Sequence, residues 1–267
     1  IRQKMDIDSL FNVKDKIVLV TGGSRGIGLM ISKGFIVNGA TVYISSRSVN
    51  ACDQIAKELN AKGPGKAISL PADLQQLDEC KRIIDEIEKR EGKLHVLINN
   101  AGATWGAPFD QYPEEGFEKV INLNLKRVFS LTQAALPLLE KASTQDDPAR
   151  VINIGSVDGI RVPAIETYAY SASKAALHHL TNVLAGNLSQ RNITFNTIAP
   201  GPFDTKMMAA TLKKHSKGFK DIIPLGRIGS PEDIAGTCIY LCSRAGVYTN
   251  GANIPVDGGY LCNKPKL

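Results

Sequence analysis

Tyr170 and Lys174 stand four positions apart in the sequence Tyr-Ser-Ala-Ser-Lys. On a helix, residues at this spacing lie on one face, so the two side chains can meet. An ammonium group beside a phenol favours the phenolate and lowers the pKa of the phenol. The pair therefore predicts that Tyr170 exchanges a proton with a carbonyl or alcohol oxygen near neutral pH. The alternative is an ordinary surface pair.

Ser156 is the second residue expected to contact a reacting oxygen. It follows the apolar run 151–154 and Gly155, which predict a buried strand that ends here. Ligands of open parallel sheets bind beyond the carboxyl ends of the strands, so Ser156 is expected to hold the substrate oxygen beside Tyr170. The sequence shows no His/Asp relay for Ser156, which is therefore not predicted to be a nucleophile. It shows no zinc-type ligand set either, and no metal is predicted.

A glycine-rich turn near the amino terminus has the spacing of a dinucleotide-binding site. Its three glycines follow a short apolar strand and open a helix. Such glycines allow a tight turn, a close approach of the backbone to a pyrophosphate, and close packing of helix on strand. The helix N-terminus then offers free N–H groups to the phosphates. The cofactor-binding residues predicted in this turn are Gly22, Ser24, Arg25, Gly26, Ile27 and Gly28.

The end of the second predicted strand indicates which dinucleotide is bound. An NAD site usually places an acidic residue there for the ribose 2′-hydroxyl, but this chain has Ser45-Ser46-Arg47. Arg25 lies in the first turn as well. Two guanidinium groups and nearby hydroxyls suit a 2′-phosphate, so Ser46 and Arg47 are predicted to favour NADP(H) over NAD(H). The alternative is that both arginines are solvated surface residues.

Strands and helices must alternate along the chain to position these groups. Apolar runs predict strands near 16–20, 41–44, 67–70, 94–98, 150–155, 193–199 and 253–256. Helical patterns follow the glycine turn and recur near 50–61, 76–91, 114–140, 168–189 and 231–243. This alternation predicts an α/β fold, a Rossmann-type doubly wound parallel sheet of about seven strands. We expect a single domain over residues 1–267, with a substrate lid near 202–223.

Composition excludes several other classes of protein. The chain has 267 residues, of which 43% are hydrophobic and 22% charged, as in a folded domain with a sizeable core. Its net charge of +6 is dispersed rather than gathered in a stripe, so no nucleic-acid partner is predicted. No apolar run reaches about 18 residues, so no membrane span is predicted.

The cysteines and the last three residues bear on the compartment. Five irregularly spaced cysteines argue against a disulfide framework and indicate a reducing, cytoplasmic environment. The ending Pro265-Lys266-Leu267 resembles a variant of the Ser-Lys-Leu address, so a peroxisomal location is the alternative.

Taken together, these motifs resemble the short-chain dehydrogenase/reductase family. The resemblance covers about residues 12–261, nearly the whole chain. Each motif is weak alone, but their joint order is specific. Besides the glycine turn, Ser156 and the Tyr170/Lys174 pair, the matching residues are Asn99-Asn100-Ala101-Gly102, Asn124, Pro200-Gly201 and Val256-Asp257-Gly258-Gly259.

The resemblance implies a role for each matching residue. Tyr170 would be the general acid in reduction, Lys174 would lower its pKa and bind the nicotinamide ribose, and Ser156 would polarise the carbonyl. Asn124 would hold a relay water beside the lysine, with Asn122 as the alternative. Further cofactor contacts are implied at Asp73 and Leu74 (adenine), Asn100, Ala101 and Gly102 (adenine ribose), and Pro200, Gly201, Phe203 and Thr205 (nicotinamide). A homotetramer built on the helices near 114–140 and 168–189 is also implied.

Within the family, the chain most resembles NADPH-dependent 3-oxoacyl reductases of the rhamnolipid-biosynthesis type. This implies a 3-oxoacyl thioester as substrate, carried on coenzyme A or acyl carrier protein and reduced to the 3-hydroxyacyl product. Four lysines in the expected lid could meet such an anionic carrier, but a helix with a solvated lysine face is the more ordinary explanation: Lys213, Lys214, Lys217 and Lys220. The alternatives are a reductase of a free ketone, sugar, polyol or quinone, and, from another class, a cofactor-binding regulator without catalysis.

Overall fold

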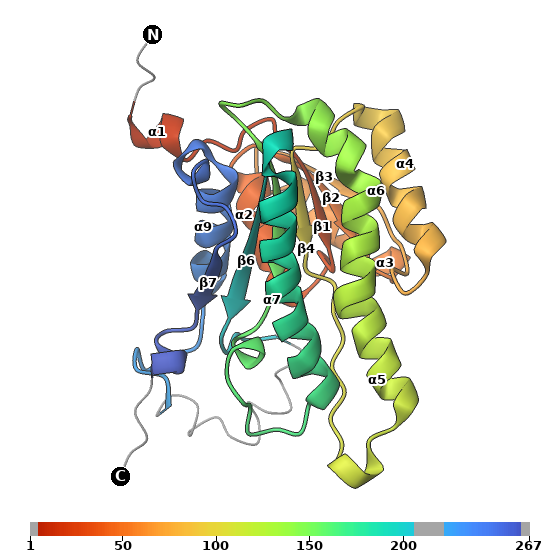
Figure 1. Ribbon diagram of the computed structural model, residues 1–267. Coiled ribbons are helices and arrows are strands. Elements are labelled where there is room, and N and C mark those ends of the chain that lie inside the picture. The colour runs from red at the N-terminus through yellow and green to blue at the C-terminus, as the bar shows by residue number, and fades with distance from the viewer. Residues whose placement is uncertain (1–4, 206–221, 263–267) are drawn as a thin grey trace.

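A computed structural model of the chain describes residues 5–205 and 222–262 (Figure 1). Seven strands form one parallel sheet in the order β3-β2-β1-β4-β5-β6-β7. This arrangement confirms the predicted doubly wound sheet of about seven strands. The strands are β1 (Ile17–Thr21), β2 (Thr41–Ser45), β3 (Lys66–Ser69), β4 (Val96–Asn99), β5 (Ala149–Ile154), β6 (Ile193–Pro200) and β7 (Asn253–Val256).

Helices cover both faces of the sheet (Figure 1). One face carries α2 (Gly26–Val37), α3 (Val49–Asn60) and α9 (Pro231–Cys242). The other carries α4 (Leu77–Glu91), α6 (Arg127–Ala142) and α7 (Tyr168–Leu188). The shorter helices are α1 (Ile7–Leu10) and α5 (Glu114–Ile121). The 3₁₀ turns among the described residues are Phe109–Gln111, Val157–Gly159, Ser189–Arg191, Arg244–Gly246 and Tyr260–Cys262.

Burial on both faces explains the unbroken apolar runs of the strands. In β1, Val18 and Val20 face the cluster that includes Phe35 of α2. Leu19, between them, faces the opposite cluster, which includes Ile83 of α4. Because neither face meets water, no position of such a strand favours a polar residue.

The strand order places a crevice at one edge of the sheet. The chain builds β1, β2 and β3 outward in one direction and then adds β4 on the other side of β1. The first connections after β1 and β4 therefore diverge, which opens a crevice beyond the carboxyl ends of these strands. The ends that border this edge include Thr21, Ser45, Asn99, Ile154 and Pro200.

The long helix expected near 114–140 is present as an unbroken helical segment from Glu114 to Ala142. What the sequence did not predict is its middle turn, Asn122–Lys126, which is π-helical and separates α5 from α6. At the centre of the turn, the Asn124 side chain bonds to the backbone of Ala103 in the loop after β4. A wider turn lets that side chain reach inward, a deviation that is frequent at functional sites and invisible to helical periodicity.

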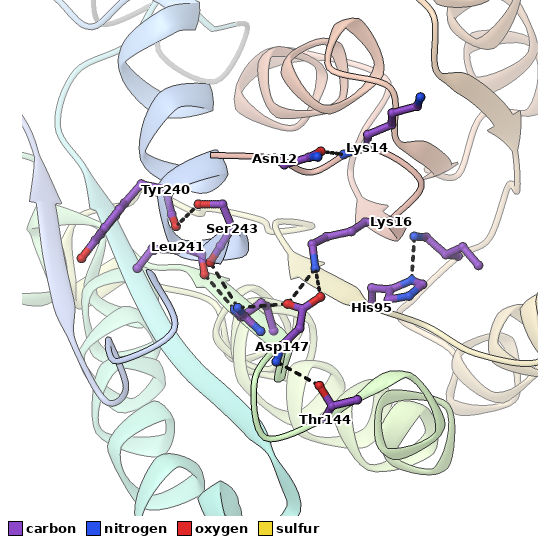
Figure 2. Close-up of polar contacts among 11 residues, drawn as sticks. Asn12, Lys14, Lys16, His95, Thr144, Asp147, Tyr240, Leu241 and Ser243 are labelled. Atoms are coloured by element: carbon purple, nitrogen blue, oxygen red, sulfur yellow. Dashed lines mark hydrogen bonds and ion pairs between the residues drawn. The ribbon is translucent and has the colours of Figure 1, made fainter. Parts of the chain in front are cut away.

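A polar cluster that joins buried cations to a half-exposed carboxylate lies at the opposite, amino-terminal edge of the sheet (Figure 2). Arg150 of β5 is fully buried and donates to the carbonyl oxygens of Leu241 and Ser243, at the end of α9, at 3.1 and 3.2 Å. Asp147 accepts from Lys16 at 2.7 Å and also lies 3.4 Å from Arg150. A cation at the carboxyl end of a helix offsets the negative end of its dipole, so this cluster fixes α9 to the sheet.

Several predictions concern residues that the structure does not describe. Only 202–205 and 222–223 of the expected lid are described, and its four lysines lie outside the described residues. The tripeptide Pro265-Lys266-Leu267 also lies outside them. Among the helices that are described, none is both long enough and apolar enough to cross a membrane.

Candidate active site

Helix α7 presents Tyr170 and Lys174 toward the end of β5. The Lys174 side chain is 5% exposed, and its Nζ donates to the carbonyl oxygen of Ile154 at 2.7 Å. The same nitrogen lies 5.6 Å from the centre of the Tyr170 ring. Burial lowers the pKa of Lys174 to about 8. Tyr168 points elsewhere, because it is exposed and donates to Glu166 at 2.8 Å.

Ser156 lies two residues beyond the end of β5 and is 6% exposed. Its Oγ accepts a hydrogen bond from the backbone N–H of Asp158 at 3.1 Å, which caps the 3₁₀ turn Val157–Gly159. The hydroxyl proton remains available to a neighbouring oxygen, and Tyr170 is hydrogen-bonded to this serine. The structure therefore brings Ser156, Tyr170 and Lys174 together, as expected.

The sequence predicted a lowered pKa for Tyr170, and this direction is wrong. Burial raises this pKa to about 12, the hydrogen bond with Ser156 opposes the rise, and the Asp158 carboxylate adds to it. Lys174 does not reverse the effect because its Nζ is directed at Ile154 rather than at the phenol oxygen. Tyr170 is consequently held as a phenol, the form that a proton donor requires.

Asn124 is buried, and both N–H groups of its side-chain amide are used in hydrogen bonds. Its Oδ1 accepts from the N–H of Ala103 at 2.8 Å, and its Nδ2 donates to the oxygens of Ala103 and Ser173 at 2.9 and 3.0 Å. Ser173 in turn donates to the Tyr170 carbonyl oxygen at 2.7 Å. Asn124 thus fastens the loop after β4 to α7.

The glycine turn has the geometry of a phosphate cradle. Gly22 and Gly26 adopt positive φ angles of 65° and 52°, which favour glycine. A Cβ at Gly28 would lie 2.2 Å from the Gly22 oxygen, so only glycine lets α2 begin this close to β1. Asn100 supports the turn by donating to the Thr21 oxygen at 2.8 Å. In the described part of the chain, no side chain caps the N-terminus of α2, which leaves its N–H groups for an anion.

The residues expected at a 2′-phosphate lie side by side. Ser24 Oγ donates to Ser46 Oγ at 2.9 Å, which joins the glycine turn to the end of β2. Ser46 also lies 3.0 Å from the buried thiol of Cys52. Arg25 and Arg47 flank this pair and are both exposed. The site therefore offers hydroxyls and two exposed cations, and no carboxylate stands at the end of β2.

The other implied cofactor residues lie around the same crevice. Thr205 approaches Gly26, since a Cβ added to that glycine would meet the Thr205 side chain at 3.3 Å. The Phe203 side chain is 1% exposed and packs against Gly229, so only its backbone can border a cofactor. Those placed at strand ends or in the loops after them are Asp73, Leu74, Asn100, Ala101, Gly102, Pro200 and Gly201.

Two residues near the reacting groups were not predicted from the sequence. The Asp158 carboxylate raises the pKa of Tyr170, and burial raises its own pKa. His178 accepts from the backbone N–H of Ser156 at 3.3 Å. The signal for His178 is its position four residues after Lys174. Asp158 has no comparable signal, because a carboxylate in a turn is ordinarily solvated.

No metal site accompanies this arrangement in the described ranges. Within 5–205 and 222–262, no group of three His, Cys, Asp or Glu side chains could hold a metal ion. The donors gathered at the crevice are backbone N–H groups, hydroxyls and cations, which suit a phosphorylated organic cofactor. The glycine turn and the N-terminus of α2, which no described side chain caps, fit the pyrophosphate of a dinucleotide.

Residues 16–216 match the family described as short chain dehydrogenase. The chain belongs to the short-chain dehydrogenase/reductase family, and it is an oxidoreductase of the type that interconverts carbonyl and alcohol groups.

Individual relatives show which members it is similar to. It is 44% identical to the rhamnolipids biosynthesis 3-oxoacyl-[acyl-carrier-protein] reductase of Pseudomonas aeruginosa, over 94% of this chain and 98% of that protein. It is 35% identical to a 3alpha-hydroxysteroid dehydrogenase of Mediterraneibacter gnavus, over 92% of this chain and 97% of that protein. Among solved structures, the RhlG/NADP active-site complex of P. aeruginosa superposes with a TM-score of 0.89 at 42% identity, covering 94% of this chain and 98% of that one.

Proposed function

We propose that this protein is an NADPH-dependent reductase that converts a 3-oxoacyl thioester into the 3-hydroxyacyl product. The observation that carries the proposal is the convergence of Ser156, Tyr170 and Lys174 at the end of β5, beside the glycine cradle. The 44% identical relative, named as a 3-oxoacyl reductase, supports the choice of substrate.

The chain's own residues explain how such a reduction would proceed. The Ser156 hydroxyl would donate to the ketone oxygen and polarise it. Tyr170, held as a phenol by burial, would deliver the proton to that oxygen as negative charge develops there. Bound NADPH would supply the hydride. Lys174 has two ammonium protons left after its bond to Ile154, and it would direct these toward the ribose hydroxyls of the cofactor.

Preference for NADPH is proposed to rest on the end of β2. Ser24 and Ser46 would donate to the 2′-phosphate from fixed positions, and Arg25 and Arg47 would close over it. Charge-assisted hydrogen bonds of this kind are about twice as strong as neutral ones. The RhlG complex, which by its name contains NADP, supports this choice.

The test is the oxidation of NADPH, followed by absorbance, with acetoacetyl-CoA as substrate and NADH in parallel. Turnover with NADPH, little with NADH, and loss of turnover in Tyr170→Phe are the expected results. Tyr168→Phe is the matched control, since that hydroxyl is exposed and bonded to Glu166. Tight NADPH binding without turnover of the thioester would refute the substrate assignment. Full activity of Tyr170→Phe would refute the catalytic one.

The same chemistry suits a free ketone, and one relative argues for testing it. A 35% identical protein is named as a hydroxysteroid dehydrogenase. A steroid ketone and a sugar ketone should therefore be assayed beside acetoacetyl-CoA. A higher kcat/KM for either would transfer the proposal to that substrate class.

We infer that the protein forms a homotetramer in which α6 and α7 meet a second copy. A groove of ≈ 520 Å³ runs between these helices and is lined by Leu125, Phe129, Leu180 and Val183. Phe129 and Val183 are 45% and 44% exposed, which is unfavourable for apolar side chains left in water. Size-exclusion chromatography with light scattering tests the assembly. A monomeric wild type, or a tetramer unchanged by Phe129→Arg, would contradict it.

A further inference from the structure

His178 lies on the same face of α7 as the reacting pair. Tyr170, Lys174 and His178 follow one another at intervals of four residues, which aligns them along the helix. His178 is 8% exposed, and its Nε2 accepts from the backbone N–H of Ser156 at 3.3 Å. Lys174, one turn earlier, donates to the Ile154 oxygen at 2.7 Å. The two side chains therefore hold the backbone on both sides of Gly155.

The Ser156 N–H needs this acceptor because the sheet ends just before it. Gly155 still donates to the Ile198 oxygen of β6, at 2.7 Å, but the β5–β6 register stops at the pair Ile154–Ile198. Beyond that point the chain turns into the segment Val157–Gly159. A buried N–H without a partner destabilises the fold, and here the imidazole nitrogen accepts the hydrogen bond that a neighbouring strand would otherwise accept.

Gly155 and Gly159 leave room for the imidazole ring. A Cβ at Gly155 would lie 2.1 Å from His178 Nε2, and one at Gly159 would lie 2.9 Å from the ring carbon Cε1. The turn that carries Ser156 is thus packed directly on the ring. A shift of the ring would move this turn, and with it the hydroxyl that faces Tyr170.

The Ser156 contact requires one particular tautomer of His178. A neutral imidazole has one acceptor nitrogen and one N–H, and here Nε2 is the acceptor. The proton must then sit on Nδ1, which lies 3.0 Å from Nδ2 of Asn253 in β7. Because an amide NH2 group only donates, this tautomer requires the Asn253 amide to be rotated by 180°, with its oxygen in the place of Nδ2. A hydrogen-bonded chain runs from β7 through His178 to the serine.

We propose that His178 is a positioning residue that fixes Ser156 opposite Tyr170 by accepting its backbone N–H through Nε2. The inference rests on the role that the proposed function gives to Ser156. It does not depend on which carbonyl compound is the substrate, because the contact involves only the backbone and the ring.

His95 supplies a matched control within the same chain. It too is largely buried and accepts a backbone N–H, from Ile17 at 2.9 Å, but through Nδ1 and at the opposite edge of the sheet (Figure 2). The two histidines should therefore show opposite tautomers, with the proton on Nδ1 in His178 and on Nε2 in His95. Substitution at either site removes the same kind of bond, and only one of the two bonds holds the catalytic serine.

The first experiment is ¹⁵N NMR on the full-length protein with labelled histidine. The chain has four histidines, and the spectra of His178→Gln and His95→Asn assign the two of interest. A protonated Nδ1 and an unprotonated Nε2 at His178 are expected. The reverse tautomer would overturn the proposal whatever the substrate proves to be.

The second experiment compares variants in steady-state kinetics. His178→Phe, which keeps volume but has no acceptor, should lower kcat about tenfold while leaving the KM for NADPH unchanged, since small misplacements weaken catalysis more than cofactor binding. His178→Gln, whose amide oxygen can reach the position of Nε2, should restore most of kcat. His95→Phe should lose stability but keep its kcat.

Equal kcat in folded His178→Phe and wild type would refute the positioning role. If the wild type does not reduce acetoacetyl-CoA, the proposed function fails separately, and the same variants are compared on ethyl acetoacetate. In that assay too, a lower kcat in His178→Phe that is restored in His178→Gln supports the positioning role. Equal kcat values in His178→Phe and wild type refute it.

Discussion

The Nζ of Lys174 donates to the carbonyl oxygen of Ile154 at 2.7 Å, two residues before Ser156. The bond uses one of three ammonium protons and ties α7 to the last residue of β5. Because Ile154 closes the strand, its position sets where the backbone turns toward Ser156. One lysine therefore takes part both in the shape of the site and in its charge.

Activity should fall on the alkaline side as Lys174 loses its proton. Burial lowers the pKa of this lysine to about 8, so the ammonium form predominates below pH 8 and disappears above it. Tyr170, with its pKa raised to about 12, remains protonated through this range. The profile of kcat/KM against pH should show a limb near 8. Lys174→Arg should move that limb upward, and an unmoved limb would contradict the assignment.

Arg47→Asp should reverse the preference between the two dinucleotides. Arg47 is exposed at the end of β2, beside Ser46, where an aspartate would repel a 2′-phosphate and accept from a 2′-hydroxyl. Losing a charge-assisted bond of about 1.5–3 kcal/mol corresponds to a tenfold to hundredfold fall in kcat/KM with NADPH. Lys57→Asp, the same charge change on the exposed side of α3, controls for net charge. If kcat/KM with NADPH falls equally in both variants, Arg47 has no specific role in cofactor choice.

Arg150→Met should destabilise the fold and spare the chemistry. The fully buried guanidinium donates to the carbonyl oxygens at the end of α9. In Arg150→Met these oxygens lose their donor, and the ion pair Lys16–Asp147 loses the neighbouring positive charge (Figure 2). Removing such a buried cation costs about 3 kcal/mol. The loss is measured by urea unfolding.

The control for Arg150→Met is a substitution at an exposed ion pair. Arg90 bonds to Glu86 on the surface of α4 at 2.7 Å and is 46% exposed. Its replacement by Met should cost less than about 1 kcal/mol. At low temperature kcat should stay near wild type in both variants. A comparable loss of stability in the two would show that Arg150 contributes no more than a surface pair.

Features that depend on residues close together in the sequence were predicted correctly, and features that depend on contacts between distant residues were not. The seven strands and the Tyr170/Lys174 face depend on local periodicity, and both were correct. The π-helical turn depends on Asn124 meeting Ala103, 21 residues away, and no helical pattern encodes that contact. The pKa of Tyr170 depends on burial among several elements, so a rule about neighbouring charges gave the wrong direction. The contact between His178 and Ser156 joins residues 22 positions apart, so no local pattern encodes it either.

The stability of the fold should fall on mild acidification because of His178. Burial, followed by the charge of Lys174, lowers its pKa from 6.5 to about 4. Between these two values His178 is protonated in the unfolded chain and neutral in the folded chain. The free energy of unfolding therefore decreases as the pH falls from 6.5 toward 4. From pH 7 to pH 5, the contribution of one such histidine is about 2 kcal/mol.

Unfolding by urea at pH 7 and pH 5 tests this, with His178→Gln beside the wild type. Glutamine gains no proton, so the variant should lose about 2 kcal/mol less than the wild type over this interval. Carboxylates titrate in both proteins and cancel in the comparison. His179→Gln changes the next residue, which is exposed, and should keep the wild-type pH dependence. Equal losses in His178→Gln and wild type would mean that the imidazole accepts a proton in the folded state, which the Ser156 contact forbids because an imidazolium has no acceptor nitrogen.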